Sequence, residues 1–409
     1  MDKNIAVTDV AVIGGGAAGL LAALVAGRMG ARTVLLEGSR ACGLKILISG
    51  GGRCNVLPSN FEIDDFFTTG SRNVLSRLFR TWKLADVHKF FEVDMGVPLV
   101  VEEATGKVFP RAQNARFVRD TLVRACEDAG VSVYTGWRVD GFECSGDNTF
   151  LIRSHSGKIL MARRIILATG GLSLPKTGSD GVGYSMARQL GHSVIDTYPA
   201  LVPLTTDDSE FKDLAGVSLP VRWRALRSGK VLEERSREFL FTHRGFSGPS
   251  ILDASHWWVR ERVAIEVSWG DLSSDDWLRH FASNPGQPVV AIVSKFLPRR
   301  LARILCNRAG ITREQRSSNM QADLRDRLLS TLCTFQLPVA GNEGYKVAEV
   351  TGGGIPLSEV IPSTLESRKT PGLYLCGEIF DVIGRIGGYN FLWAWVTGKL
   401  AGESAAKRL

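Results

Sequence analysis

Three glycines near the N-terminus have the spacing of a phosphate-binding turn. Gly14, Gly16 and Gly19 form a G-x-G-x-x-G pattern, which follows a strand-like apolar run at residues 10–13 and opens an Ala-rich helical stretch over residues 17–29. In such a turn the first glycine allows the tight bend, the second lets a pyrophosphate reach the backbone, and the third lets the helix pack on the strand. The helix start at Ala17 adds free N–H groups and the positive end of the helix dipole. The pattern predicts a dinucleotide site rather than an ordinary glycine-rich turn.

An acidic residue stands where the ribose of such a dinucleotide would lie. A second strand-like run, residues 33–36, ends at Glu37, 18 residues after Gly19. A carboxylate at this distance accepts hydrogen bonds from both hydroxyls of an adenosine ribose, and it would repel the 2′-phosphate of NADP. NAD and FAD both have an adenosine ribose without a 2′-phosphate, so the choice between these two cofactors depends on the rest of the chain.

A second glycine-rich segment, SGGGRCN, follows at residues 49–55. Three successive glycines free the backbone to point several N–H groups at one anion. Arg53 adds a cation, Asn55 an amide, and Lys45 a second cation just before the segment. Together with Gly51, these residues are expected at the pyrophosphate or at the edge of a flavin; the alternative is a flexible surface loop.

Two segments in the middle of the chain have residue patterns that are typical of cofactor contacts. A buried strand predicted over residues 164–168 ends in a turn of small residues, Ala168, Thr169 and Gly170. In flavoproteins such a turn lets the chain pass beside the cofactor. Val139, in a strand predicted over residues 137–142, is expected to recognise adenine through its backbone. The Gly-Val-Gly triplet at residues 181–183 lacks a third glycine and a preceding strand, so we reject it as a second fingerprint.

The C-terminal stretch contains residues that are typical of a flavin-binding site. An apolar strand at residues 372–376 precedes Gly377 and Glu378, and a helix is predicted over residues 391–406. Asp381 is expected to accept hydrogen bonds from ribityl hydroxyls. The helix start, with Gly388, Asn390 and Phe391, would direct its positive dipole end at the pyrimidine side of a flavin. Both ends of the chain are therefore expected to share one FAD site.

Composition limits the class of protein. The 409 residues are 44% hydrophobic and 22% charged, which is typical of a soluble globular chain of two or three domains. Residues 1–7 lack the apolar core of a secretory signal, and no stretch is long enough to span a bilayer, so we expect a cytoplasmic protein without a membrane partner. The seven cysteines are scattered and contain no C-x-x-C pair, which argues against a disulfide framework, a metal site or a redox dithiol.

Residues 198–344 differ from both ends of the chain in their pattern of predicted strands and helices. Short strands separated by turns predict a small β-barrel over residues 198–272, and helical periodicity follows over residues 273–344. His243, between a strand and a Gly/Ser/Pro turn, is the candidate for a catalytic group, against the reading of a hydrogen-bonded loop residue. Residues 295–327 carry nine bases and three acids, while the whole chain has a net charge of +8. This basic segment is a solvated helical face or a contact for nucleic acid.

These motifs together resemble one family. SGGGRCN, VFP, ATGG with LPKTGSDGVGY, PALVPL, FTHRGFSGP, VTGGGIP and the stretch from LESRKTPGLYLCGE to GGYNFLWAWVTG are similar to the HI0933-like (BaiN-type) flavoproteins, from the N-terminus to the last helix. The resemblance implies an α/β fold with a Rossmann-like two-dinucleotide-binding FAD domain, residues 1–197 and 345–409, interrupted by an inserted β-barrel and a small helical subdomain. It implies FAD contacts from Gly14, Gly16, Glu37, Lys45, Gly51, Arg53, Asn55, Val139, Ala168, Thr169, Gly170, Glu378, Asp381, Gly388, Asn390 and Phe391.

The resemblance also defines the chemistry to be expected. Family members have been linked to NAD(P)H-dependent reduction of conjugated double bonds, to oxidation of small amines, and to reduction of uracil in ribosomal RNA to dihydrouridine. Our first hypothesis is an FAD-dependent oxidoreductase that takes hydride from NAD(P)H and reduces an activated C=C bond, in a small enone or in RNA, with His243 as proton donor. The alternatives are an amine oxidase that uses O₂ and a non-catalytic, FAD-containing RNA-binding protein.

Overall fold

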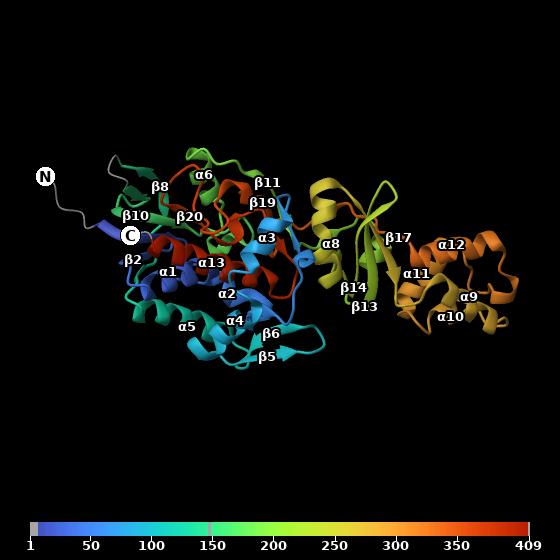
Figure 1. The fold of residues 1–409 in the computed structure, drawn as a ribbon. Helices are drawn as coiled ribbons and strands as arrows, with labels where there is room; N and C mark the ends of the chain where they lie inside the picture. Colours follow the sequence, from blue (N-terminus) through green and yellow to red (C-terminus); the bar gives the residue numbers. More distant parts are fainter. Residues whose placement is uncertain (1–6, 146–148, 408–409) are drawn as a thin grey trace. The chain divides into compact units, whose positions relative to one another are not determined.

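The computed structural model describes residues 7–145 and 149–407, so residues 1–6, which entered the assessment of a secretory signal, lie outside it (Figure 1). The chain divides into two compact units, Met1–Tyr198 with Glu349–Leu409, and Pro199–Ala348. Each unit has its own cluster of buried apolar side chains. Among the described residues, no helix is both long and apolar enough to cross a membrane.

The first unit is built on a seven-stranded sheet. Its strands follow the order β7-β2-β1-β10-β9-β8, and β20 pairs with the end of β10. β1, β2, β7, β10 and β20 run parallel, whereas β9 and β8 add an antiparallel edge. The bounds are β1 Val7–Ile13, β2 Thr33–Leu36, β7 Ser132–Tyr134, β8 Val139–Cys144, β9 Phe150–Ser154, β10 Ile159–Leu167 and β20 Leu373–Leu375. This is the Rossmann-type arrangement that the first motif predicts.

Two helices from opposite ends of the chain lie side by side against this sheet, α1 (Ala17–Arg28) and α13 (Tyr389–Lys407) (Figure 1). Their backbones approach closely because α13 places glycines at the contact. A Cβ atom at Gly398 would lie 2.5 Å from the carbonyl oxygen of Ala18, and one at Gly402 would lie 2.5 Å from that of Ala22. The N-terminal motif and the C-terminal helix are thereby held in one body.

The remaining elements of the first unit are shorter. The helices are α2 Leu44–Ile48, α3 Arg72–Phe79, α4 Leu84–Lys89, α5 Ala115–Asp128 and α6 Val182–Gln189. The strands β3 (Leu57–Pro58), β6 (Lys107–Pro110) and β5 (Leu99–Glu102) form a small antiparallel sheet. β4 (Phe66–Phe67) pairs with β21 (Ile383–Gly384), and β11 (Ile195–Ala200) pairs with β19 (Val350–Gly354).

The second unit contains an antiparallel sheet in the order β17-β16-β13-β14-β15-β12-β18. Its bounds are β12 Leu204–Thr205, β13 Ser218–Arg227, β14 Lys230–Thr242, β15 Gly245–Ser247, β16 Ala264–Trp269, β17 Phe335–Gln336 and β18 Gly341–Asn342. Within the described part of the chain, the end strands β17 and β18 do not pair with each other. The sheet is therefore open, and the closed barrel predicted from the sequence is not found.

A helix packs on the central strands of this open sheet. α8 (Gly248–Glu261) packs on β13, β14 and β16, where the sequence indicated a Gly/Ser/Pro turn. Pro249 stands in its first turn, where a proline needs no intrahelical donor. The helices α7 Ser209–Lys212, α9 Ser274–Ser283, α10 Val289–Val293, α11 Arg299–Ala309 and α12 Ala322–Cys333 complete the unit. The division of this unit at residue 273 stays a prediction.

Candidate functional site

The turn between β1 and α1 has the geometry of a phosphate cradle. Gly14 has φ +103°, and a Cβ there would lie 2.4 Å from the carbonyl oxygen of Ala168. A Cβ at Gly19 would lie 1.8 Å from the carbonyl oxygen of Gly14, so this glycine is required for the helix to reach the strand. A Cβ at Gly16 meets no protein atom within 4 Å, although Gly16 caps α1 beside its free N–H groups. The space in front of Gly16 is thus open to a ligand.

Glu37 organises the same turn from the end of β2. Its Oε2 accepts a hydrogen bond from the N–H of Gly15 at 2.7 Å, and its Oε1 accepts one from the N–H of Ser39 at 2.6 Å. The carboxylate therefore lies directly beside the glycine turn, at the position expected of a ribose acceptor. Its contact with the ribose stays a prediction.

Replacing Glu37 by alanine is expected to weaken FAD binding. The ribose hydroxyls lose a charged acceptor, which is worth about 1.5–3 kcal/mol, or roughly 10- to 150-fold in Kd. Fluorescence titration of the apoprotein with FAD measures this change. An unchanged Kd for Glu37→Ala would place the adenosine elsewhere.

The second glycine-rich segment forms a tight turn after α2. Gly50, Gly51 and Gly52 have φ values of +57°, +67° and +85°, which side-chain-bearing residues rarely adopt. A Cβ at Gly51 would meet no protein atom within 4 Å, so this turn also has open space in front of it. Arg53 stacks over the ring of Phe109 at 4.0 Å and pairs with Glu102 at 3.2 Å. Its guanidinium is held in place by these contacts, and its contact with a cofactor stays a prediction.

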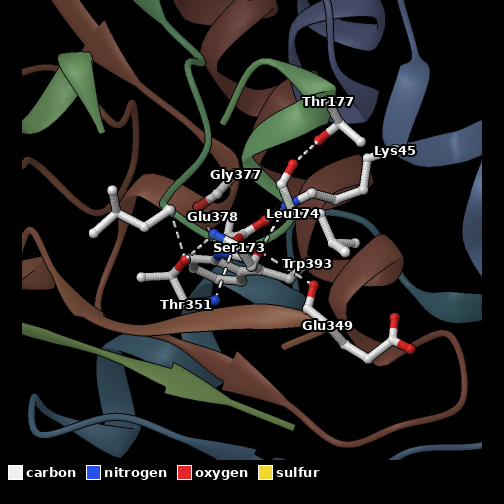
Figure 2. A network of polar contacts seen from close by, with 10 residues as sticks. Lys45, Ser173, Leu174, Thr177, Glu349, Thr351, Gly377, Glu378 and Trp393 are labelled. Carbon is white, nitrogen blue, oxygen red and sulfur yellow. Dashed lines mark hydrogen bonds and ion pairs between the residues drawn. The ribbon is translucent and has the colours of Figure 1, made fainter. Parts of the chain in front are cut away.

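A polar network joins four separate segments of the chain (Figure 2). Lys45 Nζ donates to Glu378 Oε2 at 2.8 Å and to Ser173 Oγ at 2.7 Å. Glu378 Oε1 accepts hydrogen bonds from Ser173 Oγ at 2.7 Å and from the N–H of Thr351 at 3.0 Å. Thr351 Oγ1 accepts from the N–H groups of Leu172 and Ser173. Lys45 and Glu378, both predicted FAD contacts, therefore bind each other.

Two members of this network, Ser173 and Thr351, were not predicted from the sequence. Thr351 lies in the quoted VTGGGIP motif and Ser173 lies between ATGG and LPKTGSDGVGY, but neither has a spacing that marks a function. Ser173 is fully buried, and its hydroxyl also contacts the carbonyl oxygen of Glu349 at 3.3 Å. These residues fix the backbone between the small-residue turn after β10 and the segment that carries Glu378.

Three of the predicted cofactor contacts have a buried polar atom without a hydrogen-bond partner among the described residues: Asn55 Oδ1, Thr169 Oγ1 and Asp381 Oδ1. Asp381 is 1% exposed, and its other oxygen accepts hydrogen bonds from the N–H of Thr69 at 2.9 Å and from the Thr69 hydroxyl. Buried polar atoms are almost always paired, so these three are suited to a polar ligand. Hydroxyl groups of a ribityl chain and the polar edge of a flavin meet that need, and the residues present therefore fit FAD.

The start of α13 is fixed by close backbone contact. A Cβ at Gly388 would lie 2.4 Å from the carbonyl carbon of Leu57. The Asn390 side chain accepts from the N–H of Gly384 and donates to its carbonyl oxygen, each at 2.8 Å. The Asn390 amide therefore holds the preceding turn in place. The first backbone N–H groups of the helix have no partner within the helix and can bind a ligand. Phe391 stacks on Trp395 with ring centroids 5.5 Å apart.

The other predicted contacts lie on the same unit. Val139 begins β8, and Ala168 follows β10 directly, with its N–H bonded to the carbonyl oxygen of Ile13 at 2.8 Å. Gly170 has φ +71°, and the N–H of Gly377 donates to Thr397 Oγ1 at 3.0 Å. Their contact with FAD stays a prediction, as does the adenine contact of Val139.

His243 and the cysteines have different surroundings. His243 is exposed in the second unit, between β14 and β15, and its role as proton donor stays a prediction. Six of the seven cysteines are buried, and Cys144 is exposed. Burial raises the pKa of Cys42, Cys54 and Cys126 to about 12, so these thiols stay protonated and unreactive at neutral pH.

The family model described as the HI0933-like protein Rossmann domain matches residues 8–404. The chain belongs to this family. It is 35% identical over 396 residues to the ribosomal RNA dihydrouridine synthase of Escherichia coli strain K12, covering 95% of both chains. It is 32% identical over 414 residues to the 3-dehydro-bile acid delta(4,6)-reductase of Clostridium scindens, covering 98% of this chain and 99% of the relative.

Solved structures share the fold at low sequence identity. The 3-ketosteroid delta1-dehydrogenase of Sterolibacterium denitrificans is similar with a TM-score of 0.52 and 13% identity, over 98% of this chain and all of that one. The 3-ketosteroid-delta4-(5alpha)-dehydrogenase of Rhodococcus jostii RHA1 gives 0.50 and 16%, over 98% and 96%. Family membership and the fit of the site to FAD together identify the chain as an FAD-dependent oxidoreductase.

Proposed function

We propose that this HI0933-like protein is an NAD(P)H-dependent reductase of a C=C bond that is conjugated to a carbonyl group. The observation that carries the proposal is the chemistry common to two differently named relatives. Dihydrouridine differs from uridine by hydrogenation of the ring C=C bond next to a carbonyl, and a delta(4,6)-reductase of a 3-dehydro substrate reduces double bonds conjugated to a ketone. In the reaction that we propose for this chain, a hydride and a proton would add across one C=C bond, and NAD(P)H would be oxidised to NAD(P)⁺.

Uracil in ribosomal RNA is the substrate that we propose first. Two relatives carry the name ribosomal RNA dihydrouridine synthase, the one from Escherichia coli at 35% identity and one from Haemophilus influenzae at 31%. The basic segment at residues 295–327 favours a polyanionic substrate. A small enone is the second candidate, favoured by the full-length match to the bile acid reductase.

FAD, when bound, would carry the hydride from the nicotinamide to the C=C bond. The chain's own residues would hold the cofactor and supply the proton. Gly16 and the start of α1 would bind the pyrophosphate, Glu37 the ribose, and Asp381 the ribityl chain. The Lys45–Glu378 pair would hold the two glycine-rich segments and the C-terminal strand in fixed positions around the cofactor.

Glu349 is a second candidate for the proton donor, beside His243. Its side chain is accessible to solvent, and it stands next to the network of Lys45 and Glu378 (Figure 2). The surrounding protein raises the pKa of the Glu349 carboxyl group by desolvation, and Lys45 and Lys107 oppose part of this shift. A carboxyl group with a raised pKa retains its proton to higher pH, as a general acid requires.

A pH profile distinguishes the two candidates. If Glu349 donates the proton, turnover should fall as pH rises through its raised pKa, because only the protonated carboxyl group can donate. Glu349→Gln should then lower kcat by roughly 100-fold, the lower end of general acid catalysis, and remove that pH dependence. His243→Ala is the matched comparison: if it causes the loss while Glu349→Gln retains the wild-type profile, the proton comes from His243.

The proposed function is tested with the purified FAD-loaded protein under anaerobic conditions. NADPH or NADH should bleach the oxidised flavin, and added ribosomal RNA that lacks the modification should restore the colour and gain dihydrouridine, detected by mass spectrometry of the nucleosides. Recovery of colour with a steroid enone but not with RNA would support the second candidate. Bleaching by amines but by neither nicotinamide would instead indicate an oxidase, and RNA binding without any turnover would indicate a non-catalytic protein.

A further inference from the structure

One group of bases in the second unit differs from the others by its lack of acidic partners. Seven exposed bases between residues 295 and 327 form no ion pair with a described carboxylate: Lys295, Arg299, Arg300, Arg303, Arg313, Arg316 and Arg327. We call this set the basic surface. Most other arginines of the unit are paired with acids, namely Arg222, Arg224, Arg227, Arg235, Arg237, Arg244, Arg260, Arg279, Arg308 and Arg325. The positive charge of the basic surface is therefore not neutralised within the described chain.

The start of α11 places these charges at an electrostatic cost. Arg299 and Arg300 are the first two residues of the helix, whose first turn contains no acid. Cations are disfavoured at this end because the helix dipole is positive there. α9 follows the usual rule, with Asp275 and Asp276 in its first turn and a capping box at Ser273. A positive dipole end that also carries two arginines is suited to an external anion rather than to the stability of the helix.

Two arginines of α11, Arg299 and Arg303, share one face of the helix. Arg303 follows Arg299 by one helical turn, so both side chains lie on the same side of the helix. Leu301 and Leu305 are fully buried on the opposite side. Beyond the helix, Lys295 donates to Gln287 at 2.9 Å, and Arg316 donates to the carbonyl oxygen of the neighbouring Gly286. Lys295 and Arg316 therefore both contact the loop before α10, and they add to the arginines of α11.

An exposed aromatic ring stands within this group. Phe296 is 42% exposed, between Lys295 and the start of α11. Its ring contacts Trp277 edge-to-face, with centroids 5.4 Å apart, and contacts His280 at 4.4 Å. A supported aromatic ring beside unpaired cations is the combination with which proteins bind single strands, because unstacked bases lie on the ring and phosphates meet the cations.

We propose that the basic surface, with Phe296, binds a single-stranded segment of the RNA substrate. This inference rests on the proposed function, since it assigns the macromolecule in which the reduced uracil is carried. A uracil must leave the base stack before its C=C bond can be reached, so a protein that holds single-stranded RNA selects accessible uracils. The cations give backbone affinity, and the ring favours unpaired over paired bases.

The test compares two triple variants of the FAD-loaded protein that lose equal charge. Lys295→Ala/Arg299→Ala/Arg303→Ala removes unpaired cations, and the matched control Arg227→Ala/Arg279→Ala/Arg325→Ala removes paired ones. Fluorescence anisotropy with a labelled, uridine-containing single-stranded RNA measures Kd over a series of salt concentrations. The first variant should bind about 100-fold more weakly at 0.1 M salt, and its slope of log K against log salt should fall by roughly 2, as for three lost phosphate contacts. The control should stay within about threefold of wild type.

The ring is tested separately. Phe296→Leu keeps an apolar side chain on Trp277 but removes the stacking surface, so the affinity for the single strand should fall by about tenfold while that for duplex RNA of the same length should not change. Equal losses for both RNA forms would overturn the stacking role.

Reduction of a small enone by NAD(P)H separates failure of the surface from failure of the function. If both triple variants bind RNA equally and still reduce the enone, the basic surface does not bind RNA, and the reductase activity stands. If wild type binds no RNA while it reduces the enone, both the surface and the RNA substrate are overturned. Retained flavin colour and circular dichroism show that each variant is folded.

Discussion

Gly16→Val is expected to give a folded protein that no longer retains FAD. A Cβ at this position meets no protein atom within 4 Å, and the backbone angles of Gly16, φ −75° and ψ −170°, are ones that valine adopts without strain. The added methyl groups would occupy the space in front of the start of α1, where the pyrophosphate must approach the N–H groups. We expect the affinity for FAD to fall by at least about 100-fold, or roughly 3 kcal/mol, because a rigid overlap cannot be relieved by the helix.

A neighbouring glycine provides the control for this prediction. Gly19 differs from Gly16 in that its Cβ would lie 1.8 Å from the carbonyl oxygen of Gly14. Gly19→Ala should therefore separate α1 from β1, lower the melting temperature of the apoprotein and yield little soluble protein. Gly16→Val should melt with the wild-type apoprotein while it purifies colourless. A yellow Gly16→Val protein would exclude the pyrophosphate from this turn, and a wild-type melting temperature for Gly19→Ala would contradict the packing argument.

Local pattern was sufficient to predict the two ends of the chain. The first helix was predicted over residues 17–29 and spans Ala17–Arg28, and the last was predicted over residues 391–406 and spans Tyr389–Lys407. Both begin directly after a glycine turn and are rich in apolar residues. The strand over residues 33–36 was predicted with its observed bounds, because the helix C-terminus and Glu37 enclose it. Such signals depend on neighbours within a few residues, which one sequence contains.

The middle of the chain was harder because its organisation depends on long-range contacts. The Gly-Pro at the start of α8 was interpreted as a turn, although the same residues can open a helix when a sheet is available for packing. Without that helix, the short strands suggested a closed barrel. The sheet remains open because α8 packs on its central strands and because its end strands, β17 and β18, contain two residues each.

Prediction of the site was limited in the same way, by contacts between residues that are far apart in the sequence. Glycines and acids could be placed from their spacing, but the partners of their side chains could not. Lys45 was expected at the pyrophosphate or at the edge of a flavin, a contact that stays a prediction, but its bond to Glu378, 333 residues away, was not foreseen. The residue that holds Asp381 is Thr69, 312 residues away. No local rule relates positions so far apart. The three unpartnered atoms at Asn55, Thr169 and Asp381 become visible only when burial and hydrogen bonds are known.

Asp381→Ala is expected to weaken FAD binding by roughly 10- to 150-fold, because a buried carboxylate contributes about 1.5–3 kcal/mol through a charge-assisted hydrogen bond. One oxygen of Asp381 is held by Thr69, which leaves the other, buried oxygen to accept a hydroxyl of the ribityl chain. Equilibrium titration of the apoprotein with FAD measures the loss. Titration with riboflavin, which retains the ribityl chain but lacks the adenosine and both phosphates, should show a loss of the same size.

Two variants separate the ligand contact from the anchoring of the carboxylate. Asp381→Asn can keep its carbonyl oxygen on Thr69 and donate its NH₂ group to the oxygen of the ribityl hydroxyl, so it loses only the charge and should weaken FAD binding less than alanine does. Thr69→Val removes only the hydroxyl donor and keeps the backbone N–H, so Asp381 stays in place and the loss should be within about fivefold, the size of one ordinary hydrogen bond. If Thr69→Val weakened FAD as much as Asp381→Ala does, Asp381 would act by holding the segment that contains Thr69 and not by binding the flavin.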